Sequence, residues 1–138
     1  MNNEPNSKNQ SEEVISIAEW VKKGITEETV NKADKIGKNL ADNKLTTSQI
    51  RNIFGEMRRI QMKGYKSEKS SFLLLKPKLA YAVKRNYSKG IKYFYEIFCS
   101  GFDAIDKKND VEGEKQFDNL MNILEAILAY HKYHGGKE

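Results

Sequence analysis

Apolar residues recur at intervals of three and four along most of this chain. The clearest case builds one aromatic-rich stripe from Ile91, Phe94, Tyr95, Phe98, Phe102 and Ile105. Such intervals place side chains on one face of an α-helix, whereas the side chains of a strand alternate with a period of two. Proline occurs only twice and glycine nine times, so the turns that separate the strands of a sandwich or barrel are scarce. The sequence therefore predicts an all-α fold.

Helix start and stop residues divide this pattern into five or six helices joined by short loops. Thr46 stands three residues before Gln49, the spacing of a capping box, and its helix is expected to run to about Lys63. Pro77 falls in a helix expected over residues 72–85. It should lie either inside the first turn or at a break, because proline disrupts a helix interior. With 138 residues, of which 38% are hydrophobic, the chain predicts one compact helical bundle.

The chain begins with a polar segment. Residues 1–13 are rich in Asn, Ser, Glu and Lys and carry no apolar stripe, so burial cannot offset the entropy cost of ordering them. We therefore expect a flexible N-terminal tail over residues 1–13 and a single helical-bundle domain over residues 14–138. A short helix containing Trp20 opens this domain, and Thr26 caps the start of the next helix.

Positive charge is concentrated in the middle third of the chain. Thirteen Lys and Arg but only two Glu fall between Lys44 and Lys92, a net charge of about +11 in a chain whose formal total is +5. The segments before and after this block sum to about −2 and −4. Such segregation indicates one surface that faces a polyanion.

One flank of the helix after Thr46 combines arginines with small residues. Arg51 and Arg58 lie two turns apart, at roughly 100° and 80° from Ile50 on the helical wheel. Gly55 between them leaves space for the close approach of a backbone, and Thr47 and Ser48 are expected to add hydroxyls on the same side. Because arginine binds phosphate oxygens with paired hydrogen bonds, this flank is interpreted as a surface for a sugar-phosphate strand. The alternative is a solvated charged flank whose glycine packs against another helix.

A second basic face is expected on the following helix. Lys78 and Arg85 are seven residues apart, and Tyr81 lies between them on roughly the same face. The tyrosine could stack on a base or a ribose. Packing of Tyr81 against the core is the favoured expectation, since a tyrosine between two helices is more often buried.

Three segments of the chain resemble one known family. They are LTTSQIRN at residues 45–52, KLAYAVKR at residues 78–85 and EAILAYHKYHGGK at residues 125–137. In this order and at these spacings they resemble the small helical subunit of the type III-A CRISPR-Cas effector, the Csm complex. The resemblance extends from about Ile25 to the C-terminus, and none of the three segments is a catalytic motif.

The resemblance implies a non-enzymatic subunit of an antiviral defence complex. Several copies would stack as an inner filament and bind target RNA paired with guide RNA. The other partners would be the backbone subunits and the large polymerase-like subunit. Base pairing would select the sequence, while this subunit contacts the RNA backbone and the shape of the duplex. Arg51 and Arg85, carried over by position, are the strongest RNA-binding candidates, and the helical wheel and charge count add Arg58, Arg59, Lys78 and Lys84.

An enzyme would have to use the only two histidines, His131 and His134, with Glu125 or the carboxylates near Asp110. His131 falls on the apolar stripe of the last helix, which favours a core or interface histidine, and no third metal ligand stands at a suitable offset. No catalytic residue, metal site or cofactor is predicted. Cys99 is the only cysteine and is expected to be a partly buried small residue, and a chain without disulfides fits the cytoplasm.

Two other functions remain as alternatives. In the first, the chain is a protein-protein adaptor whose acidic C-terminal third docks on the basic middle of a neighbouring copy, without direct RNA contact. In the second, a basic helix lies on a membrane surface, which the lack of exposed Trp or Phe on a wide apolar face disfavours. The longest apolar run, residues 72–75, is far too short to span a bilayer.

Overall fold

The computed structural model describes residues 5–137, and within them the chain forms six α-helices and no strand. The helices are α1 (Pro5–Lys23), α2 (Glu27–Asp42), α3 (Thr47–Lys63), α4 (Lys69–Arg85), α5 (Lys89–Ala104) and α6 (Asp110–Tyr133). The predicted all-α bundle is therefore confirmed.

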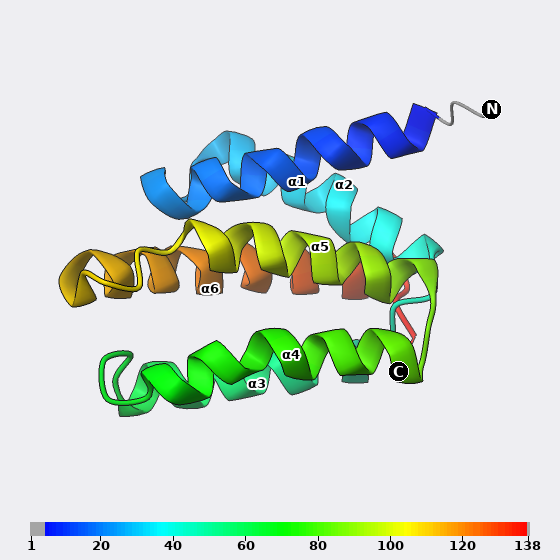
Figure 1. Cartoon of the computed structure of the whole chain (residues 1–138). Helices are drawn as coiled ribbons and strands as arrows, with labels where there is room; N and C mark the ends of the chain where they lie inside the picture. The colour runs from blue at the N-terminus through cyan, green and yellow to red at the C-terminus, as the bar shows by residue number, and fades with distance from the viewer. Residues whose placement is uncertain (1–4, 138) are drawn as a thin grey trace.

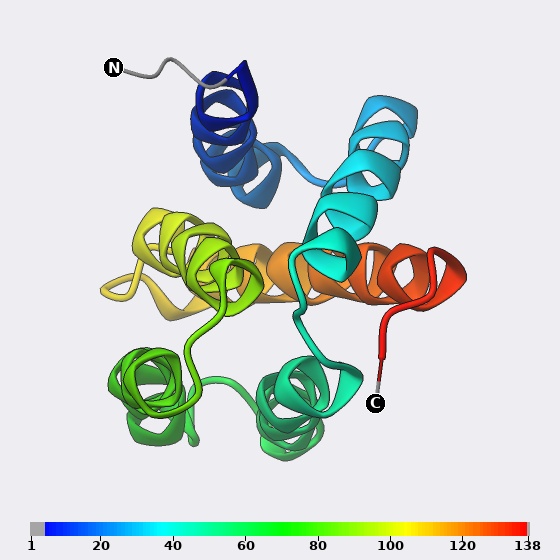
Figure 2. The ribbon, with the colours of Figure 1, turned by 90° about the vertical axis from the view of Figure 1, so that its right-hand side faces the viewer.

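The helices stack in three layers of two. Figures 1 and 2 show α1 with α2 on one side, α5 with α6 in the middle, and α3 with α4 on the other side. Because α5 is covered by neighbours on several faces, it buries Tyr93 and Ile97 in addition to most of its predicted stripe. Its Tyr95 is only partly buried. The arrangement leaves α3 and α4 as an outer layer with one face toward the core.

Polar side chains cap the helix starts as the sequence predicts. The hydroxyl of Thr46 accepts a hydrogen bond from the backbone N–H of Gln49 at 3.2 Å, and the Gln49 amide oxygen accepts one from the Thr46 N–H at 3.0 Å. Thr26 forms the equivalent capping box with Thr29. These bonds satisfy N–H groups that lack partners inside the helix, so both predicted helix starts are confirmed.

The expected position of Pro77 is wrong. The residue lies well inside α4, which begins at Lys69 and continues without a break to Arg85. Proline leaves the carbonyl group of the residue four positions earlier without its helical hydrogen bond. That residue is Leu73, and both it and Pro77 are exposed, so water can solvate the carbonyl and the helix tolerates the proline.

The first helix begins earlier than the sequence predicts. It starts at Pro5 rather than near Val14, since the fixed φ angle of proline suits the first helical position. The hydroxyl of Tyr93 donates a hydrogen bond to the carboxylate of Glu13, which ties this part of α1 to α5. The flexibility predicted for residues 1–13 stays a prediction, and residues 1–4 lie outside the described part of the chain.

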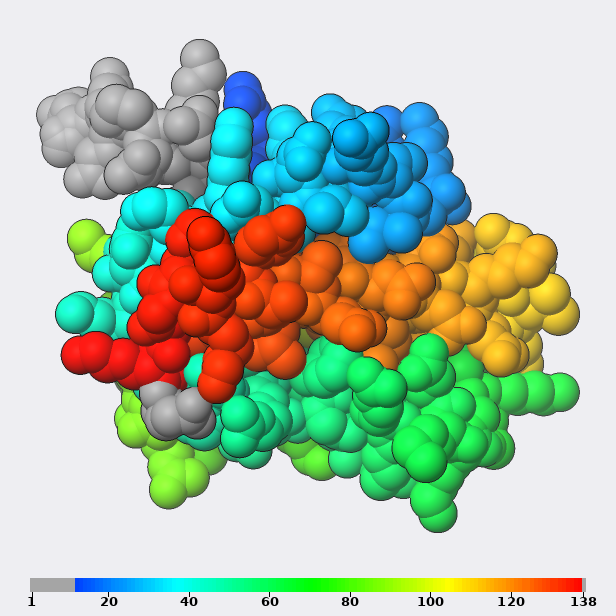
Figure 3. All heavy atoms as spheres, turned by 180° about the vertical axis from the view of Figure 1, so that it is seen from behind, coloured from blue at the N-terminus to red at the C-terminus, as the bar shows by residue number. Residues whose placement is uncertain are grey.

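The C-terminal segment crosses back to the start of α3. The backbone N–H of Thr47 donates a hydrogen bond to the carbonyl oxygen of Lys137 at 2.6 Å. Figure 3 shows this segment, in red, lying on the surface beside the start of α3. The contact joins the last residues of the chain to the layer that carries the positive charge.

Candidate nucleic-acid interface

The basic block between Lys44 and Lys92 folds into the outer layer formed by α3 and α4. Some of its cations hold this layer to the rest of the molecule. Lys76 pairs with Asp103 of α5 at 2.9 Å, and Lys69 pairs with Asp110 at the start of α6. The hydrogen bond from Lys69 lowers the pKa of the Asp110 carboxyl, and the same bond raises the pKa of Lys69. These two lysines are therefore structural.

Arg59 is also part of an ion-pair network. Its guanidinium lies 2.8 Å from a carboxylate oxygen of Glu56 and 3.0 Å from one of Glu68. Hydrogen bonding to Arg59 lowers the pKa of Glu56, and the two carboxylates raise the pKa of the guanidinium above its ordinary value. Because Glu68 is the N-cap residue of α4, Arg59 links α3 to the start of α4.

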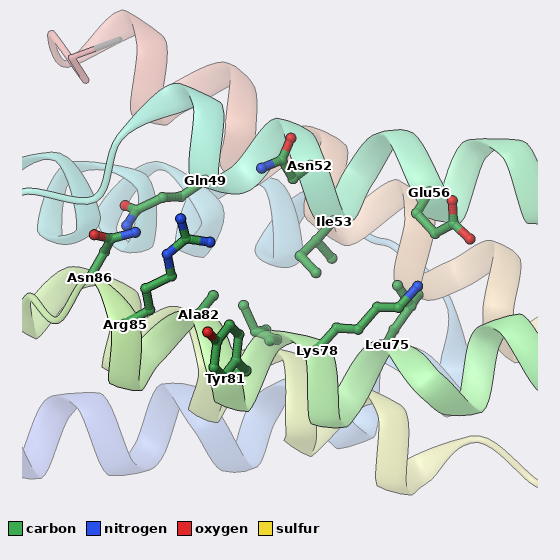
Figure 4. A pocket seen from close by; sticks show the side chains of 11 residues that line it. Gln49, Asn52, Ile53, Glu56, Leu75, Lys78, Tyr81, Ala82, Arg85 and Asn86 are labelled. Atoms are coloured by element: carbon green, nitrogen blue, oxygen red, sulfur yellow. The ribbon is translucent and has the colours of Figure 1, made fainter.

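The remaining cations of α4 include two that line a groove between α3 and α4. The groove encloses about 370 Å³. In Figure 4, Lys78 and Arg85 extend from α4 toward α3, Gln49 and Asn86 lie at the Arg85 end, and Glu56 lies near Lys78. The complete lining is Gln49, Asn52, Ile53, Glu56, Leu75, Lys78, Leu79, Tyr81, Ala82, Arg85 and Asn86.

Arg51 and Arg58 lie on a different flank of α3 from the groove. Both are exposed, and the 100° step of the helix places them roughly 140° from the residues that line the groove. A Cβ atom added to Gly55 between them would meet nothing within 4 Å. The alternative that this glycine packs against another helix is therefore wrong. The guanidinium of Arg58 lies over the ring of Phe54, 5.2 Å from its centroid.

Two side-chain positions differ from expectation. Thr47 was expected to add a surface hydroxyl but is buried, because the C-terminal segment covers the start of α3, and its hydroxyl has no partner among residues 5–137. Ser48 is exposed as expected. The side chain of Tyr81 is 65% exposed, so the favoured expectation that Tyr81 packs against the core is wrong.

The structure thus divides the six predicted RNA-binding residues among four locations. Lys78 and Arg85 line the groove, and Lys84 is exposed on the outward face of α4. The other three lie on α3, where Arg51 and Arg58 share the flank of Gly55 and Arg59 joins its two carboxylates. No single surface of α3 and α4 gathers all six.

The groove contains polar residues that the sequence analysis missed. They are Gln49, Asn52 and Glu56 on α3 and Asn86 at the C-terminal cap of α4. The first three are spaced by three and four residues, so a helical wheel could have placed them in one row beside the apolar stripe. No local pattern identifies which helix faces that row.

The histidines and the cysteine have structural environments. His131 is fully buried, which confirms it as a core histidine, and His134 pairs with Asp34. Cys99 is partly buried as predicted, and burial raises the pKa of its thiol. Within residues 5–137 no three His, Cys, Asp or Glu side chains are grouped closely enough to hold a metal ion. None of the helices described has the length and apolarity needed to cross a membrane.

Comparison with protein families gives one match. The family model described as Csm2 Type III-A matches residues 23–137, which include the whole of α2 to α6. No match was found among curated proteins or among solved structures.

Proposed function

Since the chain belongs to the Csm2 Type III-A family, it is a small subunit of the type III-A Csm complex, and we propose that it binds target RNA there without catalysing a reaction. In this proposal the subunit positions target RNA along the guide RNA, and several copies stack as an inner filament. Its partners are the RNA duplex, the backbone subunits, the large polymerase-like subunit and further copies of itself. It acts in the cytoplasm as part of antiviral defence.

This proposal is supported by the difference between cations of the outer layer that pair with carboxylates and cations that form no ion pair. Lys69, Lys76 and Arg59 are neutralised by carboxylates. No ion pair within residues 5–137 involves Arg58, Lys78, Lys84 or Arg85. A protein gains nothing in stability from a group of unneutralised cations, because they repel one another. Their retention in an outer layer supports binding to a polyanion.

The geometry favours recognition of backbone rather than sequence. Phosphate contacts by Arg and Lys position a protein on nucleic acid and carry no sequence information directly. The open space at Gly55 lets a strand approach the α3 backbone between Arg51 and Arg58. In an RNA-guided complex, base pairing with the guide supplies the sequence choice, so this subunit needs no sequence-specific contact with the RNA.

The proposal is tested with the double variant Arg51→Ala/Arg85→Ala in the assembled complex. Both side chains are exposed, so the fold should be unchanged and target-RNA affinity should fall. The matched control is Lys22→Ala/Lys35→Ala, which removes two exposed cations from α1 and α2. Affinity is measured at two salt concentrations. If the double variant and the control both bind target RNA as tightly as wild type at each of the two salt concentrations, the proposal is wrong.

A protein-protein adaptor is the second candidate, and exposed apolar residues on α4 favour it. Leu73 and Leu74 are 42% and 54% exposed, side by side in the outer layer. Apolar groups of this kind suit a contact with another protein. A pure adaptor should self-associate to the same extent with and without guide-target RNA, whereas an RNA-binding subunit should assemble more readily when RNA is added. Sedimentation velocity with and without RNA distinguishes the two.

A further inference from the structure

The groove between α3 and α4 has an apolar floor that a phosphate group alone would not use. Ile53, Leu75 and Leu79 lie at the bottom of this floor, with side chains 7%, 1% and 1% exposed, and the partly buried Ala82 and the exposed ring of Tyr81 supply the apolar surface that a ligand can reach. A bound phosphate would contact the cations at the rim and leave the apolar floor unused. The floor instead suits a flat, mainly apolar group with polar edges.

The rim of the groove supplies an aromatic ring. Tyr81 is 65% exposed and stands between Lys78 and Arg85 on α4. An exposed tyrosine ring beside two cations contributes little to the core of the protein. Proteins that bind single-stranded RNA stack unpaired bases on such rings.

Amide side chains provide hydrogen-bonding groups of both kinds. Asn52 and Asn86 are exposed at the groove, and each carries a donor and an acceptor. The Gln49 oxygen already accepts the N–H of Thr46, which leaves its NH₂ group as a donor. The edges of nucleobases present neighbouring donors and acceptors, so amides are suited to them.

The two ends of the groove differ in charge. The ionised form of Glu56 is stabilised by Arg59, and this carboxylate lies near Lys78 and reduces the positive charge at that end without forming an ion pair with the lysine. Arg85 at the other end is accompanied by Gln49 and Asn86, which are uncharged. A nucleotide would therefore place its phosphate at Arg85 and extend its base over the floor toward Glu56.

From these four features we infer that the groove holds one unstacked nucleobase of the bound RNA, with Tyr81 against the face of the base and Arg85 at its phosphate. The inference rests on the proposed RNA-binding function and adds the chemical class that the groove recognises. An acidic segment of a partner protein could also use Lys78 and Arg85, but it would leave the apolar floor and the amides without a role.

The experiment compares two RNAs of equal length and charge with the full-length protein. One is an unstructured 12-nucleotide RNA, and the other is the same backbone with abasic residues. Fluorescence anisotropy at low salt gives the dissociation constant for each RNA. Because a base stacked on an aromatic ring strengthens binding by about tenfold, wild type should bind the base-bearing RNA roughly that much more tightly.

Variants at the groove separate base contacts from phosphate contacts. Tyr81→Leu should remove most of the difference between the two RNAs, while Tyr81→Phe keeps the ring and should preserve it. Arg85→Ala should weaken both RNAs by the same factor. Circular dichroism verifies that each variant is folded.

Three results would overturn the inference. Equal affinity of wild type for the two RNAs would exclude base recognition while leaving RNA binding intact. A difference that persists in Tyr81→Leu would place the base elsewhere. Equal competition by a polyglutamate peptide of the same charge would favour a protein occupant. Failure of both RNAs to bind, in the free protein and in the assembled complex, would instead remove the proposed function itself.

Discussion

The Nε2 atom of His131 lies 2.6 Å from the carbonyl oxygen of Leu45. A carbonyl oxygen only accepts hydrogen bonds, so Nε2 carries a proton and donates it to Leu45. Nδ1 is buried and has no partner among residues 5–137. This bond joins α6 to the loop before α3, close to the bond between Thr47 and Lys137, so the C-terminal end of the protein fixes the start of the basic layer.

Replacing His131 should therefore destabilise the protein. His131→Leu removes the donor and leaves the Leu45 carbonyl without this hydrogen bond, which should lower the free energy of unfolding by about 1–3 kcal/mol. Urea denaturation measures the change, and His131→Gln, which keeps an N–H donor, should lose less. If the His131→Leu and His131→Gln variants have the same free energy of unfolding, the hydrogen bond does not contribute to stability.

Two glycines should respond in opposite ways to alanine. A Cβ atom on Gly37 of α2 would lie 2.7 Å from the backbone nitrogen of His131, so α2 and α6 would have to move apart. Gly37→Ala should lower the free energy of unfolding by about 1–3 kcal/mol because of this overpacking.

Gly55→Ala is the matched substitution in open space. Nothing lies within 4 Å of the added Cβ atom, and alanine is the better helix former, so stability should rise by up to about 1 kcal/mol. Thermal unfolding of the two variants tests this. A loss of stability in Gly55→Ala would contradict the open environment of this position.

The ion pair between Lys69 and Asp110 should make stability depend on pH in the acid range. The pKa of Asp110 is lowered in the folded protein, mainly by the hydrogen bond from Lys69. The stabilisation is therefore complete above the unfolded pKa of about 4 and is lost as the pH falls through the lower folded pKa.

Asp110→Asn should remove this contribution. The variant should be less stable than wild type at pH 7, and the gap between their melting temperatures should narrow at pH 3. The melting temperatures of both proteins are followed by circular dichroism across this range. A gap that is as wide at pH 3 as at pH 7 would show that the effect of the substitution is not electrostatic.

Removal of Arg85 should change the salt dependence of RNA binding, whereas removal of Arg59 should change the stability of the protein. If Arg85 contacts one phosphate, Arg85→Ala should reduce the slope of log affinity against log salt by about one. Arg59→Ala breaks the pairs to Glu56 and Glu68, so it should lower the melting temperature while leaving that slope nearly unchanged. RNA titrations at several salt concentrations, together with melting curves, measure both effects. The opposite assignment of the two effects would reverse the roles given to these arginines.

Much of the local structure follows from the sequence because its causes lie within a few residues of one another. The capping box of Thr46 and Gln49 and the apolar face of α5 depend on spacing alone. His131 could be assigned to the core because it stands on an apolar stripe. The same reasoning failed at Pro77, where the exposure of Leu73 decides whether a missing hydrogen bond is tolerated.

The candidate site was only partly predictable. The positions of Lys78 and Arg85 on one face of a helix follow from their spacing, but their meeting with Asn52 and Gln49 depends on how α4 packs beside α3. A helical wheel gives the angle of a side chain about its own axis and contains no information on which neighbour covers that angle. For this reason the expectation that Tyr81 packs against the core was wrong, and the side chain is exposed.

By itself, the sequence determined an all-α fold, a concentration of positive charge between Lys44 and Lys92, and the family likeness carried by three segments. Tertiary structure alone decided which of those charges are neutralised. Arg59, Lys69 and Lys76 meet carboxylates, whereas Lys78 and Arg85 line a groove with amides and an exposed tyrosine. The physical reason is the sequence separation of the interacting residues. Helix caps and apolar stripes involve residues three or four positions apart, whereas ion pairs such as Lys69 with Asp110 form only when distant helices pack together.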